Sequence, residues 1–210
     1  MLKLAYHFLK FNLNLSHFRE YQFCTFDLFK PLPSDALNKL NLLLESYDLF
    51  ESLQIRVSDG TLLGLVRDGC LIKHDNDIDF DLIWSKSAEK QIFKLAKSKK
   101  WTLIRKVVFH GRIQQLVYHD QDEVIFDFIF WVADERFCIN FSEPGCYRVM
   151  PSAFLTNLQD KEINGVCYKI PVKIEEWLVY RYGSYWNVPQ FEKGDWKLDC
   201  GDIGLAWWME

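Results

Sequence analysis

The sequence predicts an α+β fold in which a mixed β-sheet is flanked by helices. Helix-like and strand-like patterns alternate in the first half of the chain, and three strand-like runs then follow one another. Of the 210 residues, 49% are hydrophobic and 16% are aromatic, which is enough to bury a sizeable core. We expect one domain over residues 34–210, preceded by a helical or extended segment over residues 1–33.

Each element follows from a local pattern. Helices are predicted where apolar residues recur at helical spacing, and strands where β-branched and aromatic residues run between turn residues. The first elements are a helix over 36–53, a short strand over 55–57, a helix over 60–66, a strand over 77–84 and a Lys-rich helix over 87–99. The later elements are strands over 102–109, 112–118 and 124–132, a hairpin turning at Asn164-Gly165, and a helix between Pro171 and Gly183.

Charge and cysteine usage exclude several classes of protein. A net charge of -4 argues against a protein held to nucleic acid mainly by phosphate neutralisation, so no nucleic-acid partner is expected. The six cysteines include no C-x-x-C pair, which disfavours a zinc site and favours reduced thiols in a cytoplasmic protein. No apolar run reaches the roughly 18 residues of a membrane-spanning helix.

The first 23 residues interleave leucines and phenylalanines with basic residues. They lack the apolar core and the cleavage site of a signal peptide. The pattern fits a helix that lies on a membrane surface, and it also fits a helix that packs on its own domain. We favour packing, and peripheral membrane contact through this segment remains the alternative.

The strongest chemical signal is the acidic run that begins at Asp75. Side chains alternate along a strand, so Asp75, Asp77, Asp79 and Asp81 are expected on one face, roughly 7 Å apart. No basic residue interrupts them, and like charges so placed repel. A polar, solvated sheet face is the alternative interpretation. A hard divalent cation such as Mg²⁺ or Mn²⁺ removes the repulsion, so we favour a metal site.

A third metal ligand is expected from a neighbouring strand. Residues 124–131 are apolar except for Asp127, and burying a lone carboxylate there costs several kcal/mol. A structural Arg or Lys partner would explain Asp127. A metal shared with Asp77 and Asp79 is the interpretation we favour.

The segment before the acidic strand has features that suit phosphate binding. Gly60 and Thr61 lie at a strand-to-helix turn, where glycine permits close backbone approach and a new helix offers free N–H groups to an anion. Gly64 lies one turn further along. Arg67 follows three residues later, where it would reach a phosphate or remain a surface charge at the helix end.

These residues resemble the hallmark of the LicD/fukutin family, which reads roughly G-T-L-L-G-x-x-R-x-x-x-x-I-P-W-D-x-D-x-D. The matching stretch begins at Asp59-Gly60-Thr61 and ends at Asp79. The run at 124–130 is similar to the family's strand with the third acidic residue. The closing pattern I-P…E-E-x-L…Y-G-x-x-W-x-x-P is matched from Ile170 to Pro189.

The resemblance implies a fold of the nucleotidyltransferase superfamily and a cytoplasmic transferase, peripheral to the inner membrane if its N-terminus binds lipid. Such enzymes move a phospho-alcohol, such as phosphocholine or ribitol phosphate, from a CDP-activated donor to a glycan acceptor of the lipopolysaccharide or capsule type. Asp77, Asp79 and Asp127 become catalytic metal ligands, and the substrate-binding positions become Gly60, Thr61, Gly64, Arg67 and Asp75.

The sequence departs from the family pattern at two points. Lys73-His74 replaces the usual Pro-Trp in the wall of the pocket, and Asp81 is an additional carboxylate. The chain also lacks the membrane anchor and the extra domain of the animal relatives, so we expect a compact bacterial form.

The expected reaction is in-line attack by an acceptor hydroxyl on the phosphate next to the alcohol, with CMP leaving. Asp127 or Asp81 is expected to take the hydroxyl proton. Two other functions stay open: transfer of the nucleotide itself from a nucleoside triphosphate, and a catalytically inactive member that serves as a binding protein.

Overall fold

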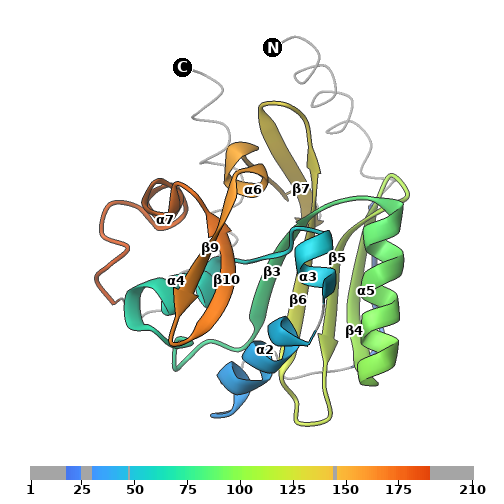
Figure 1. Ribbon diagram of the computed structural model, residues 1–210. Coiled ribbons are helices and arrows are strands. Elements are labelled where there is room, and N and C mark those ends of the chain that lie inside the picture. The colour runs from blue at the N-terminus through green and yellow to red at the C-terminus, as the bar shows by residue number, and fades with distance from the viewer. Residues whose placement is uncertain (1–17, 25–29, 47, 144–145, 190–210) are drawn as a thin grey trace.

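A central sheet organises the computed structural model, which describes residues 18–24, 30–46, 48–143 and 146–189. Its main path runs in the order β1 (Phe18–Gln22), β4 (Thr102–Phe109), β5 (Arg112–His119), β6 (Ile125–Ala133), β3 (Ile78–Ile83) and β2 (Arg56–Val57) (Figure 1). β3 and β6 pair in parallel and the other neighbours on this path are antiparallel. The predicted mixed α+β sheet is therefore confirmed.

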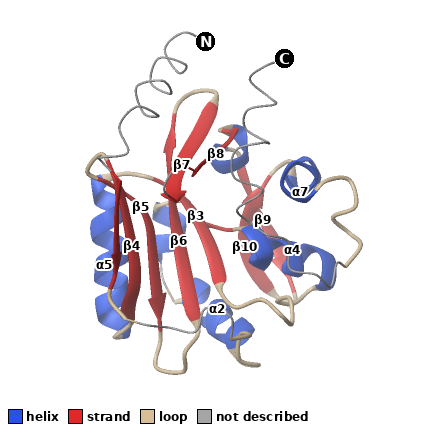
Figure 2. Cartoon of the chain, turned by 180° about the vertical axis from the view of Figure 1, so that it is seen from behind, coloured by secondary structure: helices blue, strands red, loops and turns tan. Residues whose placement is uncertain are grey.

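Helices cover one face of this sheet. α2 (Ala36–Glu45), α3 (Asp48–Ser52) and α5 (Lys86–Lys99) lie in front of the strands in Figure 1 and behind them in Figure 2. The core forms on this side. Phe80 stacks on Phe128 with ring centroids 5.0 Å apart, and Trp101, just after α5, stacks on Phe126 at 4.3 Å. Because strand residues alternate, the side chains between these aromatics project to the opposite face.

Further elements stand beside β2 and β3. They are α4 (Asp59–Asp68), α6 (Ala153–Thr156), the hairpin of β9 (Leu158–Ile163) and β10 (Val166–Pro171), and α7 (Ile174–Tyr182). The hairpin turns where predicted. Asn164 and Gly165 both have positive φ, 54° and 82°, as the two-residue turn of a twisted hairpin requires. The Asn164 side chain donates to the carbonyl of Gly69, so the turn is tied to the end of α4.

Three features differ from the sequence prediction. The single helix expected over 36–53 is divided into α2 and α3, which lets Phe50 pack against Phe80 with centroids 5.3 Å apart. Residues 18–22, from the segment expected to precede the domain, add an edge strand to its sheet. β7 (Phe137–Glu143), β8 (Cys146–Pro151) and α6 were not predicted; β7 pairs with β6 and β8.

Within the described part of the chain, the helices fall short of the length and hydropathy that crossing a bilayer requires. The amphipathic helix expected near the N-terminus falls mostly in residues 1–17, outside the described residues.

Candidate metal and phosphate site

The parallel pairing of β3 with β6 brings two acidic residues together. Asp79 and Asp127 are direct register partners, so their side chains project from the same sheet face, and each is only 7% exposed. Asp75 and Asp77 lie in the segment that leads into β3, and both are half-buried. One ligand oxygen from each of Asp75, Asp77 and Asp79 lies within 4.8 Å of the other two. Three of the four carboxylates expected on one face therefore form a compact cluster, and the fourth, Asp81, is not part of it.

These carboxylates oppose one another's ionisation. Burial, followed by the charges of Asp77 and other neighbouring carboxylates, raises the pKa of Asp79 well above its usual value. Burial also raises the pKa of Asp127 to about 7, although a hydrogen bond from Gln115 acts in the opposite direction. A cation among the carboxylates would favour their charged forms and remove this cost.

Asp127 has one satisfied oxygen and one unsatisfied oxygen. Its Oδ2 accepts a hydrogen bond of 2.6 Å from Gln115 Nε2, so its partner is an amide and not the Arg or Lys considered from the sequence. Its Oδ1 is buried and has no hydrogen-bond partner among the described residues. Buried polar atoms are rarely left without a hydrogen-bond partner, because each such atom lowers the stability of the fold by about 1–3 kcal/mol. The orphaned oxygen and the all-carboxylate donor set both fit a hard divalent cation.

Gly60 is where the phosphate-binding turn meets the acidic cluster. A Cβ placed on Gly60 would lie 2.2 Å from Asp75 Oδ2, so any side chain at this position would displace that carboxylate. The hydroxyl of Ser58 makes no cap bond to α4 in the described chain, because it donates to Asp81 instead. The first turn of α4 therefore lies next to Asp75.

Thr61 anchors the acidic strand to α4. Its side chain is fully buried, and its hydroxyl oxygen accepts a hydrogen bond of 2.8 Å from the backbone N–H of Asp79. The backbone N–H of Ser58 donates to the carbonyl of Asp79 at 3.0 Å. These two bonds hold the backbone of Asp79 against the start of α4. We therefore assign Thr61 a role in positioning Asp79.

Gly64 and Arg67 lie further along α4. A Cβ on Gly64 would lie 2.5 Å from the carbonyl oxygen of Cys70, so glycine lets the helix pack closely on the following loop, and we assign Gly64 a packing role. Arg67 is in the last turn of α4, at the far end of the helix from Gly60. Its guanidinium pairs with Asp68, with Nε–Oδ1 and Nη2–Oδ2 distances of 2.9 and 2.6 Å.

Asp81 belongs to a buried structural network. Its Oδ2 accepts from Arg56 and Ser58, both at 2.6 Å, and its Oδ1 accepts from Trp131 Nε1 at 2.7 Å. With both oxygens engaged and only 2% of the residue exposed, Asp81 is not placed to take a proton from a substrate. Of the two proton acceptors considered from the sequence, the geometry leaves Asp127.

The fold brings to the site two arginines that no sequence pattern indicated. Asp59, the first residue of α4, binds Arg148 of β8 through Oδ2 at 2.9 Å and Arg181 of α7 through Oδ1 at 2.8 Å. Burial acts to raise the pKa of Asp59, but the two guanidinium groups hold this pKa below its usual value. Arg148 lies on a strand that was itself not predicted. Arg181 could have been noticed only from its place beside the closing motif.

The closing motif also contributes Tyr182. Burial and the charge of Asp59 raise its pKa well above the ordinary value, and the charges of Asp79 and Asp75 act in the same direction. Tyr182 therefore lies within electrostatic reach of the cluster. Lys73 and His74, which replace the family's Pro-Trp, are both exposed.

Comparison with known proteins places this site in a family. The sequence profile described as LicD/FKTN/FKRP, nucleotidyltransferase domain, matches residues 53–173. No curated protein matches the chain. Several solved structures are similar to it, and two of them follow. A lincosamide antibiotic adenylyltransferase, LnuA, in its lincomycin-bound form, has 12% identity and a TM-score of 0.47 over 74% of this chain and 89% of that chain. An antigenic nucleotidyltransferase-like protein from Paracoccidioides brasiliensis has 19% identity and a TM-score of 0.40 over 72% and 66%.

The matched span carries the three clustered carboxylates, Asp127 and the Gly60 turn. It covers more than half of the sequence, and the sheet and helices around it form the mixed α+β architecture expected from the sequence. This chain therefore belongs to the LicD/FKTN/FKRP family of nucleotidyltransferase domains, and it is a transferase of that family.

Proposed function

We propose that this protein is a Mg²⁺- or Mn²⁺-dependent transferase that moves a phospho-alcohol from a CDP-activated donor to a hydroxyl of a cell-surface glycan. The observation that carries the proposal is the acidic cluster. Three carboxylates offer oxygens within 4.8 Å of one another, and a fourth, Asp127, keeps a buried oxygen without a partner among the described residues beside them. Family membership supports the transferase chemistry.

Asp77 and Asp79 would hold the ion together with Asp75, whose ligand oxygen lies within 4.8 Å of theirs. Asp127, the register partner of Asp79, is the further ligand that we propose. When bound, the ion would neutralise phosphate charge and lower the pKa of a nearby hydroxyl. Gly60 and the first amides of α4 would orient the donor phosphates, because a helix N-terminus attracts anions.

In the proposed reaction the acceptor hydroxyl oxygen attacks the phosphorus next to the alcohol. A new P–O bond forms, the bond to the bridging oxygen breaks, and CMP leaves with the electron pair. The hydroxyl proton passes to the Asp127 carboxylate, which acts as the general base.

The test begins with the donor. Full-length protein is mixed with Mg²⁺ and with CDP-choline, CDP-glycerol, CDP-ribitol or a nucleoside triphosphate, and thermal stabilisation and released products are measured. We expect stabilisation by a CDP-alcohol and slow release of CMP. Pyrophosphate release from a triphosphate would instead show nucleotidyl transfer, and metal-dependent binding of none of these donors would overturn the proposal.

Matched variants test the site itself. Asp77→Asn and Asp79→Asn keep the size of each side chain and remove its charge, so both proteins should fold and lose metal-dependent stabilisation and transfer. The control is Asp160→Asn, which removes an exposed carboxylate on β9 and should retain both. Full activity in both cluster variants would refute the metal assignment.

A further inference from the structure

We infer that Arg148 and Arg181, braced by Asp59, form a paired guanidinium site that binds the diphosphate group of a nucleotide-activated donor. The inference deepens the proposed function and rests on it. It adds two substrate-binding residues, from β8 and α7, which the sequence patterns did not identify.

The two arginines are held by one shared carboxylate. Each oxygen of Asp59 takes one guanidinium, Oδ2 from Arg148 Nη1 and Oδ1 from Arg181 Nε. The side chains of all three residues are 16–17% exposed, so the group is accessible at its edge and otherwise shielded. The shared carboxylate holds two guanidinium groups together, and guanidinium groups are the donors that suit an anionic group from a substrate.

The backbone at Asp59 is itself unusual. Its φ is +36°, in the left-handed region that non-glycine residues rarely occupy. Such a conformation costs on the order of 1–3 kcal/mol and persists only where surrounding contacts impose it. The residue with this backbone conformation is the one whose carboxylate holds the two arginines at the start of α4.

The guanidinium pair adjoins the acidic cluster. Asp59 directly precedes Gly60, which touches Asp75. The charge of Arg148 also acts to lower the pKa of Asp127, and the charge of Asp59 acts to raise that of Asp79. Carboxylates for a cation and guanidinium groups for an anion therefore stand side by side. A diphosphate that spans both would have negative charge stabilised at each of its two phosphates.

Neighbouring side chains restrict the orientation of Arg148. Its guanidinium lies over the ring of Trp131 at 5.1 Å, and that ring is fixed in turn by its hydrogen bond to Asp81. Its Nε is buried and finds no acceptor within the described parts of the chain. A planar guanidinium with donors to spare matches the oxygens of a phosphate in a bidentate manner, which an ammonium group cannot do.

Binding measurements with CDP and CMP test the inference. The full chain, with Mg²⁺ present, is titrated calorimetrically with each nucleotide, in the wild type and in Arg148→Met and Arg181→Met. Loss of one charge-assisted contact should weaken CDP binding about tenfold or more in each variant. CMP, which lacks the second phosphate, should be affected less. Stabilisation by Mg²⁺ alone should remain, because the carboxylates are intact.

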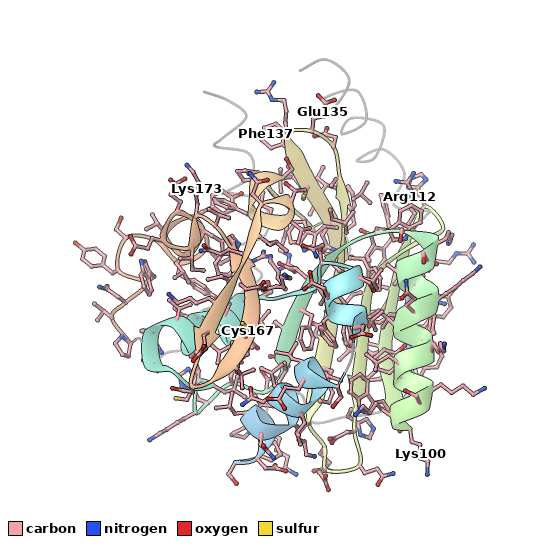
Figure 3. The ribbon with its side chains drawn as sticks, in the orientation of Figure 1. Lys100, Arg112, Glu135, Phe137, Cys167 and Lys173 are labelled. Carbon is pink, nitrogen blue, oxygen red and sulfur yellow. The ribbon has the colours of Figure 1, made fainter. Side chains whose placement is uncertain are left out.

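The controls separate this inference from the function on which it rests. Arg136→Met removes an exposed arginine at the turn between β6 and β7, where Glu135 and Phe137 are labelled in Figure 3, and should bind CDP as the wild type does. If Arg148→Met fails to fold, Arg148→Lys keeps the charge and most of the packing, and it should still lose CDP affinity because the bidentate fork is gone.

Unchanged CDP affinity in the Met variants would overturn the paired site while leaving the proposed function intact, and so would equal losses for CDP and CMP. If wild-type protein binds Mg²⁺ but no CDP compound, the donor class in the proposed function fails instead. If the Met variants bind Mg²⁺ more tightly than the wild type and bind CDP equally well, the arginines act only as counter-ions to the carboxylates.

Discussion

Replacing Asp127 by asparagine should make the metal-free protein more stable and should remove part of its response to metal. The folded protein holds this carboxyl at a pKa of about 7, mainly because it is buried, whereas an unfolded chain holds it near 3.8. A difference of roughly 3 pH units, at 1.36 kcal/mol each, amounts to about 4 kcal/mol. Asparagine keeps the size of the side chain and can still accept the hydrogen bond from Gln115.

The direction of the pH dependence follows from proton linkage. Below about pH 4 the Asp127 carboxyl is protonated in both the folded and the unfolded protein. Its ionisation therefore takes nothing from the free energy of unfolding in this range. Between about pH 4 and pH 7 the unfolded chain releases this proton while the folded chain retains it, so the metal-free wild type loses stability as pH rises. Above about pH 7 the loss is complete. The asparagine variant should lack this component of the pH dependence.

The assay is urea denaturation followed by tryptophan fluorescence, in EDTA and then in Mg²⁺, across this pH range. In EDTA at about pH 8 the variant should be more stable by up to about 4 kcal/mol. Mg²⁺ should stabilise the wild type more than the variant, because binding to the folded state alone adds RT ln(1 + [L]/Kd). The control is Asp122→Asn, an exposed carboxylate on the β5–β6 turn, with an expected change within about 1 kcal/mol. If the Asp127→Asn protein is less stable than the wild type in EDTA at about pH 8, this prediction is wrong.

Three further variants test separate parts of the site. Gly60→Ala should push the Asp75 carboxylate aside and weaken Mg²⁺ affinity about 10- to 100-fold, with little loss of stability; unaltered metal titration would contradict the contact. Arg56→Met should leave the Asp81 carboxylate buried without its cation and should lower the free energy of unfolding by about 3–5 kcal/mol. Urea denaturation measures this loss, and a loss below about 1 kcal/mol would count against the structural role of the ion pair. Gly64→Ala should lower the free energy of unfolding, measured in the same way, by about 1–3 kcal/mol, because the added methyl group would lie 2.5 Å from a backbone oxygen. The folded fraction of this variant should still bind metal.

Local patterns in the sequence were sufficient for most elements around the site. The strand that carries Asp79, the helix that starts near Gly60 and the hairpin at Asn164-Gly165 all follow from side-chain periodicity and turn chemistry, which act between near neighbours. Both the cluster of Asp75, Asp77 and Asp79 and the family could be inferred, because the residues lie within one short stretch. The division of the first helix was not predicted, because it depends on where Phe50 finds a core partner.

The amino-acid order was therefore sufficient to infer the chemistry of one stretch: closely spaced carboxylates after a glycine turn. How each carboxylate is used depends on the three-dimensional packing. Strand register set Asp127 beside Asp79, a buried arginine made Asp81 structural, and the packing of β8 and α7 brought Arg148 and Arg181 to Asp59. These outcomes join residues up to 122 positions apart, and no local rule fixes them because each depends on burial and on the charge of a distant partner.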